Sequence, residues 1–146
     1  MVTRAQVCAE ALEWLGTPYR FQASLKGVGA DCIGLLTGVA RQLGIIPADF
    51  QTPWYDPEFH VHHDRELYAE LLAAHGCTPI ALPLAEPADI LLFQFRPYRV
   101  ASHGAFLIDA ERVVHAAFRR QVVCHRLDAT WTRRLAWVFR LPEVTP

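Results

Sequence analysis

Apolar residues recur at helical spacing in separate segments of the first half of the chain. Thr3 and Gln6 have the spacing of a capping box, and the apolar positions that follow predict a helix over residues 4 to 15. Asp31 is a favourable N-cap for a second helix, whose apolar face ends at Gly44. The loop between the two helices has no clear period, and loops of this length are often functional.

Residues 45 to 87 form the least regular part of the sequence. Prolines interrupt every hydrophobic period up to Asp64. We interpret Asp64 as the N-cap of a third helix that ends at Gly76. This section is predicted to be a variable insertion of helix and loop.

After Pro87 the pattern changes to short runs typical of β-strands. Five strands are predicted, over residues 90–95, 103–108, 112–118, 121–127 and 135–141. Connections as short as Asp109–Glu111 form hairpins and not parallel crossovers. We therefore predict an α+β fold with N-terminal helices packed on an antiparallel β-sheet.

Composition favours a single domain over residues 1–146. The 146 residues are 52% hydrophobic and 20% charged, which is enough to bury a core without disulfides or a structural metal. The net charge is −1 and there is no basic stripe, so nucleic acid is not an expected partner. No apolar run could cross a membrane and residues 1–13 lack the features of a secretory signal, so neither membrane insertion nor a signal peptide is expected.

Cys32 follows Asp31 and falls in the first turn of the second predicted helix. Unpaired N–H groups and the positive end of the helix dipole favour a thiolate at this position. The negative charge of Asp31 opposes ionisation, so a reactive Cys32 requires a nearby cation, for which an imidazolium is suited. The alternative is a small buried hydrophobic residue, which most lone cysteines are.

Two histidines of the strand-rich half are predicted to meet. If Ile108 pairs with Arg112 around a three-residue loop, His103 and His115 become diagonal neighbours on one sheet face, with Cβ atoms ~7 Å apart. A two-residue loop would place them on opposite faces. With Cys32 they would form a nucleophile, a base and an orienting residue. The alternative is that each is an ordinary half-buried strand residue.

Other histidines and cysteines are assigned no chemistry. His60, His62 and His63 are explained by a solvated loop, although imidazole is a common metal ligand. Cys124 and His125 would point to opposite faces of one strand and could not easily hold one ion, so both are interpreted as structural. Neither a metal nor a cofactor is predicted.

Five short motifs occur in the order found in the NlpC/p60 family of cell-wall cysteine peptidases, which the chain therefore resembles. They are Trp14-Leu15-Gly16-Thr17-Pro18-Tyr19, Asp31-Cys32-Ile33-Gly34, Ala88-Asp89-Ile90-Leu91-Leu92-Phe93, Ser102-His103-Gly104-Ala105-Phe106 and Val114-His115-Ala116. Many members have serine after the cysteine and glycine before the aspartate, where this chain has Ile33 and Ala88.

This resemblance implies a papain-like cysteine peptidase fold and hydrolysis of amide bonds in peptidoglycan stem peptides, often between γ-D-glutamate and the diamino acid. It assigns Cys32 as the nucleophile, His103 as the base and His115 as the third triad residue. Tyr19 matches a tyrosine that reaches the nucleophile region in this family. Together with Asp31 it is assigned to oxyanion and substrate binding.

The segment from Trp131 to Pro142 resembles the subgroup encoded with phage tails and gene transfer agents. The expected partners are thus muropeptides and phage-tail or gene-transfer-agent proteins. Such a protein would be made in the bacterial cytoplasm, enter a tail particle and act on the cell wall. Two alternatives remain, the same triad used by an acyltransferase or esterase, and a catalytically silent tail-assembly or wall-binding module.

Overall fold

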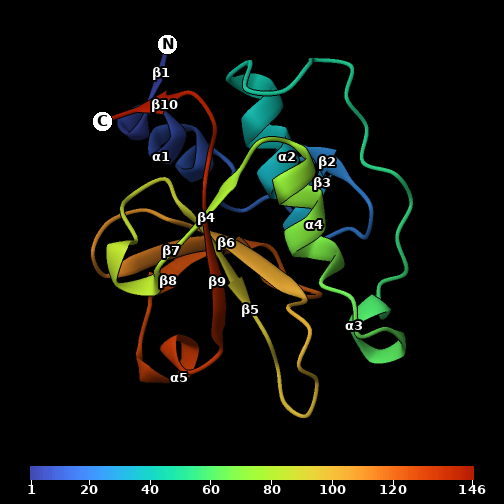
Figure 1. Cartoon of the computed structure of the whole chain (residues 1–146). Coiled ribbons are helices and arrows are strands. Elements are labelled where there is room, and N and C mark those ends of the chain that lie inside the picture. Colours follow the sequence, from blue (N-terminus) through green and yellow to red (C-terminus); the bar gives the residue numbers. More distant parts are fainter.

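A six-stranded antiparallel sheet forms the centre of the molecule in the computed structural model, which describes residues 1–146 (Figure 1). Its strands, in spatial order, are β4 (Thr78–Ile80), β9 (Leu135–Arg140), β5 (Ile90–Phe93), β6 (His103–Leu107), β7 (Arg112–Ala116) and β8 (Val122–Arg126). All five predicted strands are present, each slightly shorter than predicted. The edge strand β4 was not predicted, because Pro79 weakens the strand pattern of this segment. Proline lacks the N–H that a central strand needs, and β4 accordingly lies at the edge of the sheet.

The hairpin between β6 and β7 has the predicted register. Phe106 lies opposite Val114 and Leu107 opposite Val113, as a three-residue loop requires. The Asp109 carboxylate closes the loop, because its Oδ1 accepts the N–H groups of residues 111 and 112 at 2.9 Å each. The sheet face that each histidine occupies is therefore set by the turn.

Two helices at the start of the chain pack on one face of the sheet (Figure 1). Helix α1 (Arg4–Glu13) begins with the predicted capping box, in which Thr3 and Gln6 bond each other's backbone N–H groups. Helix α2 (Cys32–Gln42) begins as predicted after Asp31, which accepts the N–H of Gly34 at 2.7 Å.

The predicted cap of the third helix is wrong. Helix α4 (Leu67–Ala74) begins three residues after Asp64, and its N-cap residue Glu66 makes no side-chain capping bond. A short helix, α3 (Phe59–His62), precedes it, and the chain is extended at His63. The Glu66 carboxylate instead accepts the backbone N–H of residue 101, so tertiary contact replaces the local cap.

Several short elements were not predicted. These are β1 (Val2–Thr3), β2 (Ser24–Leu25), β3 (Gly29–Ala30), the 3-10 turn η1 (Leu82–Leu84), α5 (Ala129–Thr132) and β10 (Val144–Thr145). The pairing of β1 with β10 brings the two ends of the chain together (Figure 1). Helix α5 lies on the sheet face opposite α1 and α2 (Figure 1).

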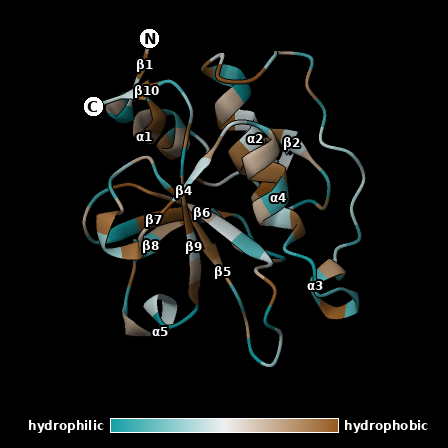
Figure 2. Ribbon diagram, viewed as in Figure 1, coloured by the Kyte–Doolittle hydropathy of each residue, from teal (hydrophilic) through white to brown (hydrophobic).

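The two faces of the sheet bury unequal cores. A cluster of 25 buried residues fills the helical side, whereas only six form the cluster on the side of α5. The central strands are mainly hydrophobic and the turn between β5 and β6 is mainly hydrophilic (Figure 2). Most of the hydrophobic stabilisation therefore lies between the helices and the sheet.

Asp89, which directly precedes β5, is a structural residue. Its carboxylate is fully buried and accepts bonds from Arg140 at 2.9 Å and from Arg4 at 3.1 Å. These bonds, with the Glu86 N–H, hold the pKa of Asp89 below its ordinary value despite burial. The preceding Ala88 has φ +77°, a left-handed conformation that favours glycine.

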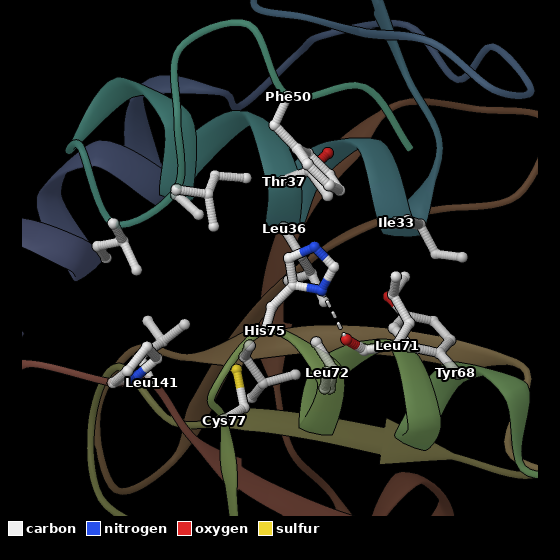
Figure 3. Close-up of a pocket in the computed structure, with 15 residues that line it drawn as sticks. Ile33, Leu36, Thr37, Phe50, Tyr68, Leu71, Leu72, His75, Cys77 and Leu141 are labelled. Carbon is white, nitrogen blue, oxygen red and sulfur yellow. Dashed lines mark hydrogen bonds between the residues drawn. The ribbon is translucent and has the colours of Figure 1, made fainter. Parts of the chain in front are cut away.

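Helix α4 faces α2 across a small apolar cavity of about 40 Å³ (Figure 3). Leu36 and Phe50 line one side, and Tyr68 and Leu72 line the other. His75 closes the end of α4, with Nδ1 bonded to the Leu71 carbonyl at 3.0 Å (Figure 3). The section after residue 45 therefore packs against the helix that carries Cys32. None of the helices has the length and apolar content needed to cross a bilayer.

Candidate active site

Cys32 is the first residue of α2 and lies against the start of β6. Its Sγ lies 3.9 Å from the Ser102 carbonyl oxygen, and the N–H of Gly104 also acts on the sulfur. The thiol therefore sits beside the backbone on both sides of His103. It makes no hydrogen bond to the His103 ring in this structure.

The electrostatics of Cys32 differ from those predicted for a helix N-terminus. Burial, with the charge of Asp31, raises the pKa of the thiol to about 12. The N–H groups of Gly104 and Ile33 act in the opposite direction but are outweighed. In the resting structure Cys32 is thus a thiol and not the predicted thiolate, because desolvation and the charge of Asp31 outweigh the helix N-terminus.

His103 and His115 meet as the hairpin register predicts. Nε2 of His103 lies 2.8 Å from Nδ1 of His115, with the ring planes nearly perpendicular. His115 is 4% exposed, and the small side chain of Ala105 between them is fully buried on the same face. The Nδ1 atom of His103 has no hydrogen-bond partner.

A third histidine, His125, joins this pair and was not predicted to do so. Its Nε2 lies 2.7 Å from Nε2 of His115. In the β7–β8 hairpin His115 lies opposite Val123, so His125 is a diagonal neighbour on the same face. The alternation of side chains along a strand, which predicts the contact of His103 with His115, also predicts this contact across the next hairpin.

Trp131 of α5 covers the three imidazoles. Its ring centroid lies 6.1 Å from that of His103, 5.0 Å from His115 and 5.1 Å from His125. The Arg134 guanidinium lies over the Trp131 ring, 5.4 Å from its centroid. Helix α5 therefore separates the histidines from solvent on this face of the sheet.

The two residues predicted to bind the oxyanion or substrate both lie near Cys32. Tyr19 packs edge-on against Phe118, and burial with the charges of Cys32 and Asp31 raises the pKa of its hydroxyl. Asp31 is buried, and besides capping α2 it accepts the Gln22 N–H at 2.7 Å and the Tyr55 hydroxyl. These bonds make Asp31 an anchor of the surrounding loops.

No protein-family profile matches this chain. Proteins named probable endopeptidase in Mycobacterium tuberculosis and Mycobacterium bovis are 31% identical to it over 115 residues. The match covers 78% of this chain and 23% of those proteins, so the chain spans about a quarter of their length.

Solved structures show a closer correspondence over the whole chain. The NlpC/p60 domain of the peptidoglycan hydrolase SagA matches with a TM-score of 0.65 and 20% identity, covering 95% of this chain and 99% of that domain. An NlpC/p60 family protein from Bacillus cereus gives a TM-score of 0.70 at 16% identity, over 95% of this chain and 40% of that one. The chain has the NlpC/p60 fold.

The same fold also serves proteins without catalysis. RipD from Mycobacterium tuberculosis, described as a non-catalytic NlpC/p60 domain protein adapted to peptidoglycan binding, matches with a TM-score of 0.58 and 12% identity. This match covers 97% of this chain and 99% of RipD. The predicted papain-like α+β class is thereby confirmed, whereas activity must be argued from the site. The predicted phage-tail subgroup stays a prediction.

Tyr68 is a feature of this site that the sequence pattern did not indicate. It comes from α4, is 1% exposed, and its hydroxyl faces the Cys32 thiol and makes no other hydrogen bond. The hydroxyl is close enough to Cys32 to lower the pKa of the thiol. A Cβ on Gly104 would lie 2.4 Å from it, so glycine at 104 makes room for this hydroxyl.

Tyr68→Phe is expected to make Cys32 less reactive and to change the stability of the protein by less than about 1 kcal/mol. Removing the buried hydroxyl relieves its desolvation cost, but it also loses the interaction of that hydroxyl with the Cys32 thiol. Loss of the hydroxyl also removes a group that lowers the pKa of Cys32. The urea midpoint and the alkylation rate of Cys32 against pH measure the two effects. Tyr55→Phe is the matched control and should destabilise, because it deletes the bond to Asp31.

The buried histidines should make stability depend on pH. Burial lowers the pKa of His103 to about 3 and that of His115 to about 4, from an ordinary 6.5. Below pH 6.5 the unfolded chain therefore binds protons that the folded protein does not. These histidines do not affect stability above pH 6.5, where both states are neutral, and they lower it as the pH falls toward these values, by up to about 1.4 kcal/mol per pH unit for each histidine.

Urea unfolding between pH 7.5 and about 4.5 measures this slope. His115→Gln should flatten it by one proton, whereas His62→Gln, at an exposed site, should leave it unchanged. An identical slope in His115→Gln and the wild type would contradict the assignment of a buried neutral His115.

The remaining histidines are not gathered into a metal site. No group of three or more His, Cys, Asp or Glu side chains is arranged to hold a metal ion. His62 lies 3.5 Å from Glu58, and His60 packs edge-on against Tyr98 at 5.1 Å. His63 ends α3 in an extended conformation. All four cysteines are free thiols.

Proposed function

We propose that this domain is a cysteine peptidase that hydrolyses amide bonds in peptidoglycan stem peptides. The observation that carries the proposal is the hydrogen bond between His103 and His115, formed beside a cysteine at the N-terminus of α2. These three residues have the chemistry of a nucleophile, a base and an orienting residue. The matches to probable endopeptidases and to a peptidoglycan hydrolase domain support this substrate class.

The reaction begins with a neutral Cys32 thiol and a neutral His103 imidazole. As the Cys32 sulfur attacks the amide carbonyl carbon, its proton passes to Nδ1 of His103, the nitrogen without a hydrogen-bond partner. A C–S bond forms, and the carbonyl oxygen becomes an oxyanion for which the Cys32 N–H is the first donor. His103 then protonates the leaving amine and the C–N bond breaks. Water attacks the acyl carbon while His103 takes its proton, a C–O bond forms and the C–S bond breaks. The proton on His103 then returns to the Cys32 sulfur, which releases the carboxylic acid product.

Tyr19 is assigned to the oxyanion or the bound peptide. Its hydroxyl stays protonated at neutral pH because its pKa is raised, so it can donate a hydrogen bond to a carbonyl oxygen. Asp31 supports substrate binding indirectly, because it anchors the loop that surrounds Cys32. No step requires a metal or an organic cofactor.

The test is incubation of the purified protein with defined muropeptides, followed by mass spectrometry. Hydrolysis adds one water across one amide bond, and the product masses identify that bond. The same protein with Cys32 alkylated is the negative control. Transfer of the acyl group to an added amine would instead show an acyltransferase, and binding without turnover a wall-binding module. Either result would overturn the proposal.

We further propose that the domain works within a phage-like tail particle. The support for this is the resemblance of the segment from Trp131 to Pro142 to tail-encoded relatives. The protein would be made in the bacterial cytoplasm and reach the wall with the particle. Co-sedimentation of the protein with particles purified from an induced culture tests the association, and its absence from them contradicts it.

A further inference from the structure

His125 is connected to the proposed catalytic histidines by an unbroken series of hydrogen bonds. Its Nε2 lies 2.7 Å from Nε2 of His115, whose Nδ1 lies 2.8 Å from Nε2 of His103. On its other side, Nδ1 of His125 lies 2.7 Å from the carbonyl oxygen of Arg126. The series thus runs from a backbone carbonyl to the imidazole of His103, whose flanking residues contact the Cys32 sulfur through their backbone.

The Arg126 carbonyl sets the direction of every bond in the series. A carbonyl oxygen only accepts, so a neutral His125 carries its proton on Nδ1 and must accept at Nε2. His115 then donates from Nε2 and accepts at Nδ1. His103 consequently donates from Nε2 and keeps its lone pair on Nδ1. That nitrogen is the one that must take the proton of Cys32.

The surroundings keep the two inner imidazoles uncharged. Burial holds His103 and His115 neutral, and the aromatic ring of Trp131 lies over all three imidazoles. The guanidinium of Arg134 lies over the ring of Trp131. No carboxylate is within ion-pair distance, in contrast to His62. Neutral tautomers alone therefore orient the base.

We propose that His125 is a positioning residue that fixes the tautomer of His103 through His115. The inference rests on the proposed function for its effect on catalysis, whereas the tautomers belong to the resting protein. Selecting the wrong tautomer of a catalytic histidine is costly in other enzymes that use a hydrogen-bonded orienting residue. Cys32 would then face an N–H instead of a lone pair.

Long-range proton–nitrogen NMR spectra of the protein labelled with ¹⁵N-histidine test the tautomers directly. At neutral pH we expect protonated Nε2 and free Nδ1 in His103 and His115, and the opposite in His125. In His125→Phe, both inner histidines should become mixtures of tautomers. His62→Phe is the control and should preserve the pattern. A free Nε2 on His103 in the wild type would overturn the proposal, as would an unchanged His103 in His125→Phe.

Steady-state kinetics of muropeptide hydrolysis provide the second measurement. His125→Phe should lower kcat by about 10- to 100-fold with little change in KM, because a positioning residue acts on the base and not on the bound substrate. His125→Gln should restore most of the activity, since a carboxamide oxygen can accept the Nε2–H of His115. Equal losses in the phenylalanine and glutamine variants would show a merely structural role and overturn the proposal.

Failure of the proposed function would be recognised separately. In that case no variant, nor the wild type, would hydrolyse muropeptides, while the nitrogen spectra would still support or contradict the tautomer series. The rate of Cys32 alkylation gives the same information without a substrate. It should fall in His125→Phe and not in His62→Phe or His125→Gln, and equal rates in all variants would contradict the inference.

Discussion

Cys32→Ala is expected to lower the rate of muropeptide hydrolysis by about 10⁴-fold or more, because no other group in the site can form the acyl-enzyme. The alanine keeps the helical start after Asp31, so the circular dichroism spectrum and the urea midpoint should stay near those of the wild type. Mass spectrometry of the products over long incubations measures the residual rate. Cys124→Ala, which alters a free thiol on β8, is the matched control and should retain full activity.

His103→Ala should reduce hydrolysis to a similar extent, since the thiol of Cys32 is protonated at rest and needs a base. The losses of activity in Cys32→Ala and His103→Ala should not add, because both residues act in the same step and removing either one already prevents it. The double variant is therefore expected to be no slower than Cys32→Ala alone. Substantial activity in either single variant would contradict the proposed mechanism, and additive losses would show that the residues act in separate steps.

Gly34→Ala is expected to be the most destabilising single-methyl change in the chain. A Cβ at this position would lie 1.8 Å from the carbonyl oxygen of Ala23 and 3.0 Å from Oδ1 of Asp31. The oxygen belongs to the backbone, which is held by the bond from the Asp31 N–H and by Ser24, whose hydroxyl donates to the Gly34 carbonyl at 2.6 Å. The loop before α2 must therefore move, at a cost of about 3–5 kcal/mol or failure to fold.

Gly44→Ala is the matched control for this prediction. Gly44 has φ +72° and nothing within 4 Å of its hypothetical Cβ, so its substitution tests backbone conformation without a clash. We expect it to cost about 1–2 kcal/mol. Urea unfolding compares the two variants. A cost for Gly34→Ala no larger than that for Gly44→Ala would contradict the close contact between α2 and the loop before it.

Local patterns were sufficient for the framework of this domain. The capping box at Thr3, the cap at Asp31 and the hairpin around Asp109 are interactions between residues a few positions apart, and all three have the predicted geometry. Because side chains alternate along a strand, the three-residue loop also decided that His103 and His115 share a face. The sequence by itself thus determined the fold class and the meeting of the two histidines.

Other features depend on packing between segments that are distant in the sequence, which local sequence patterns do not predict. Tyr68 reaches Cys32 only because α4 packs against α2, and Glu66 bonds residue 101 instead of a cap following Asp64. Burial of the site also reverses the charge state predicted for Cys32, since the cost of removing a thiolate from water exceeds the benefit of the helix N-terminus. Desolvation depends on everything that surrounds a group, so only the tertiary structure could decide it.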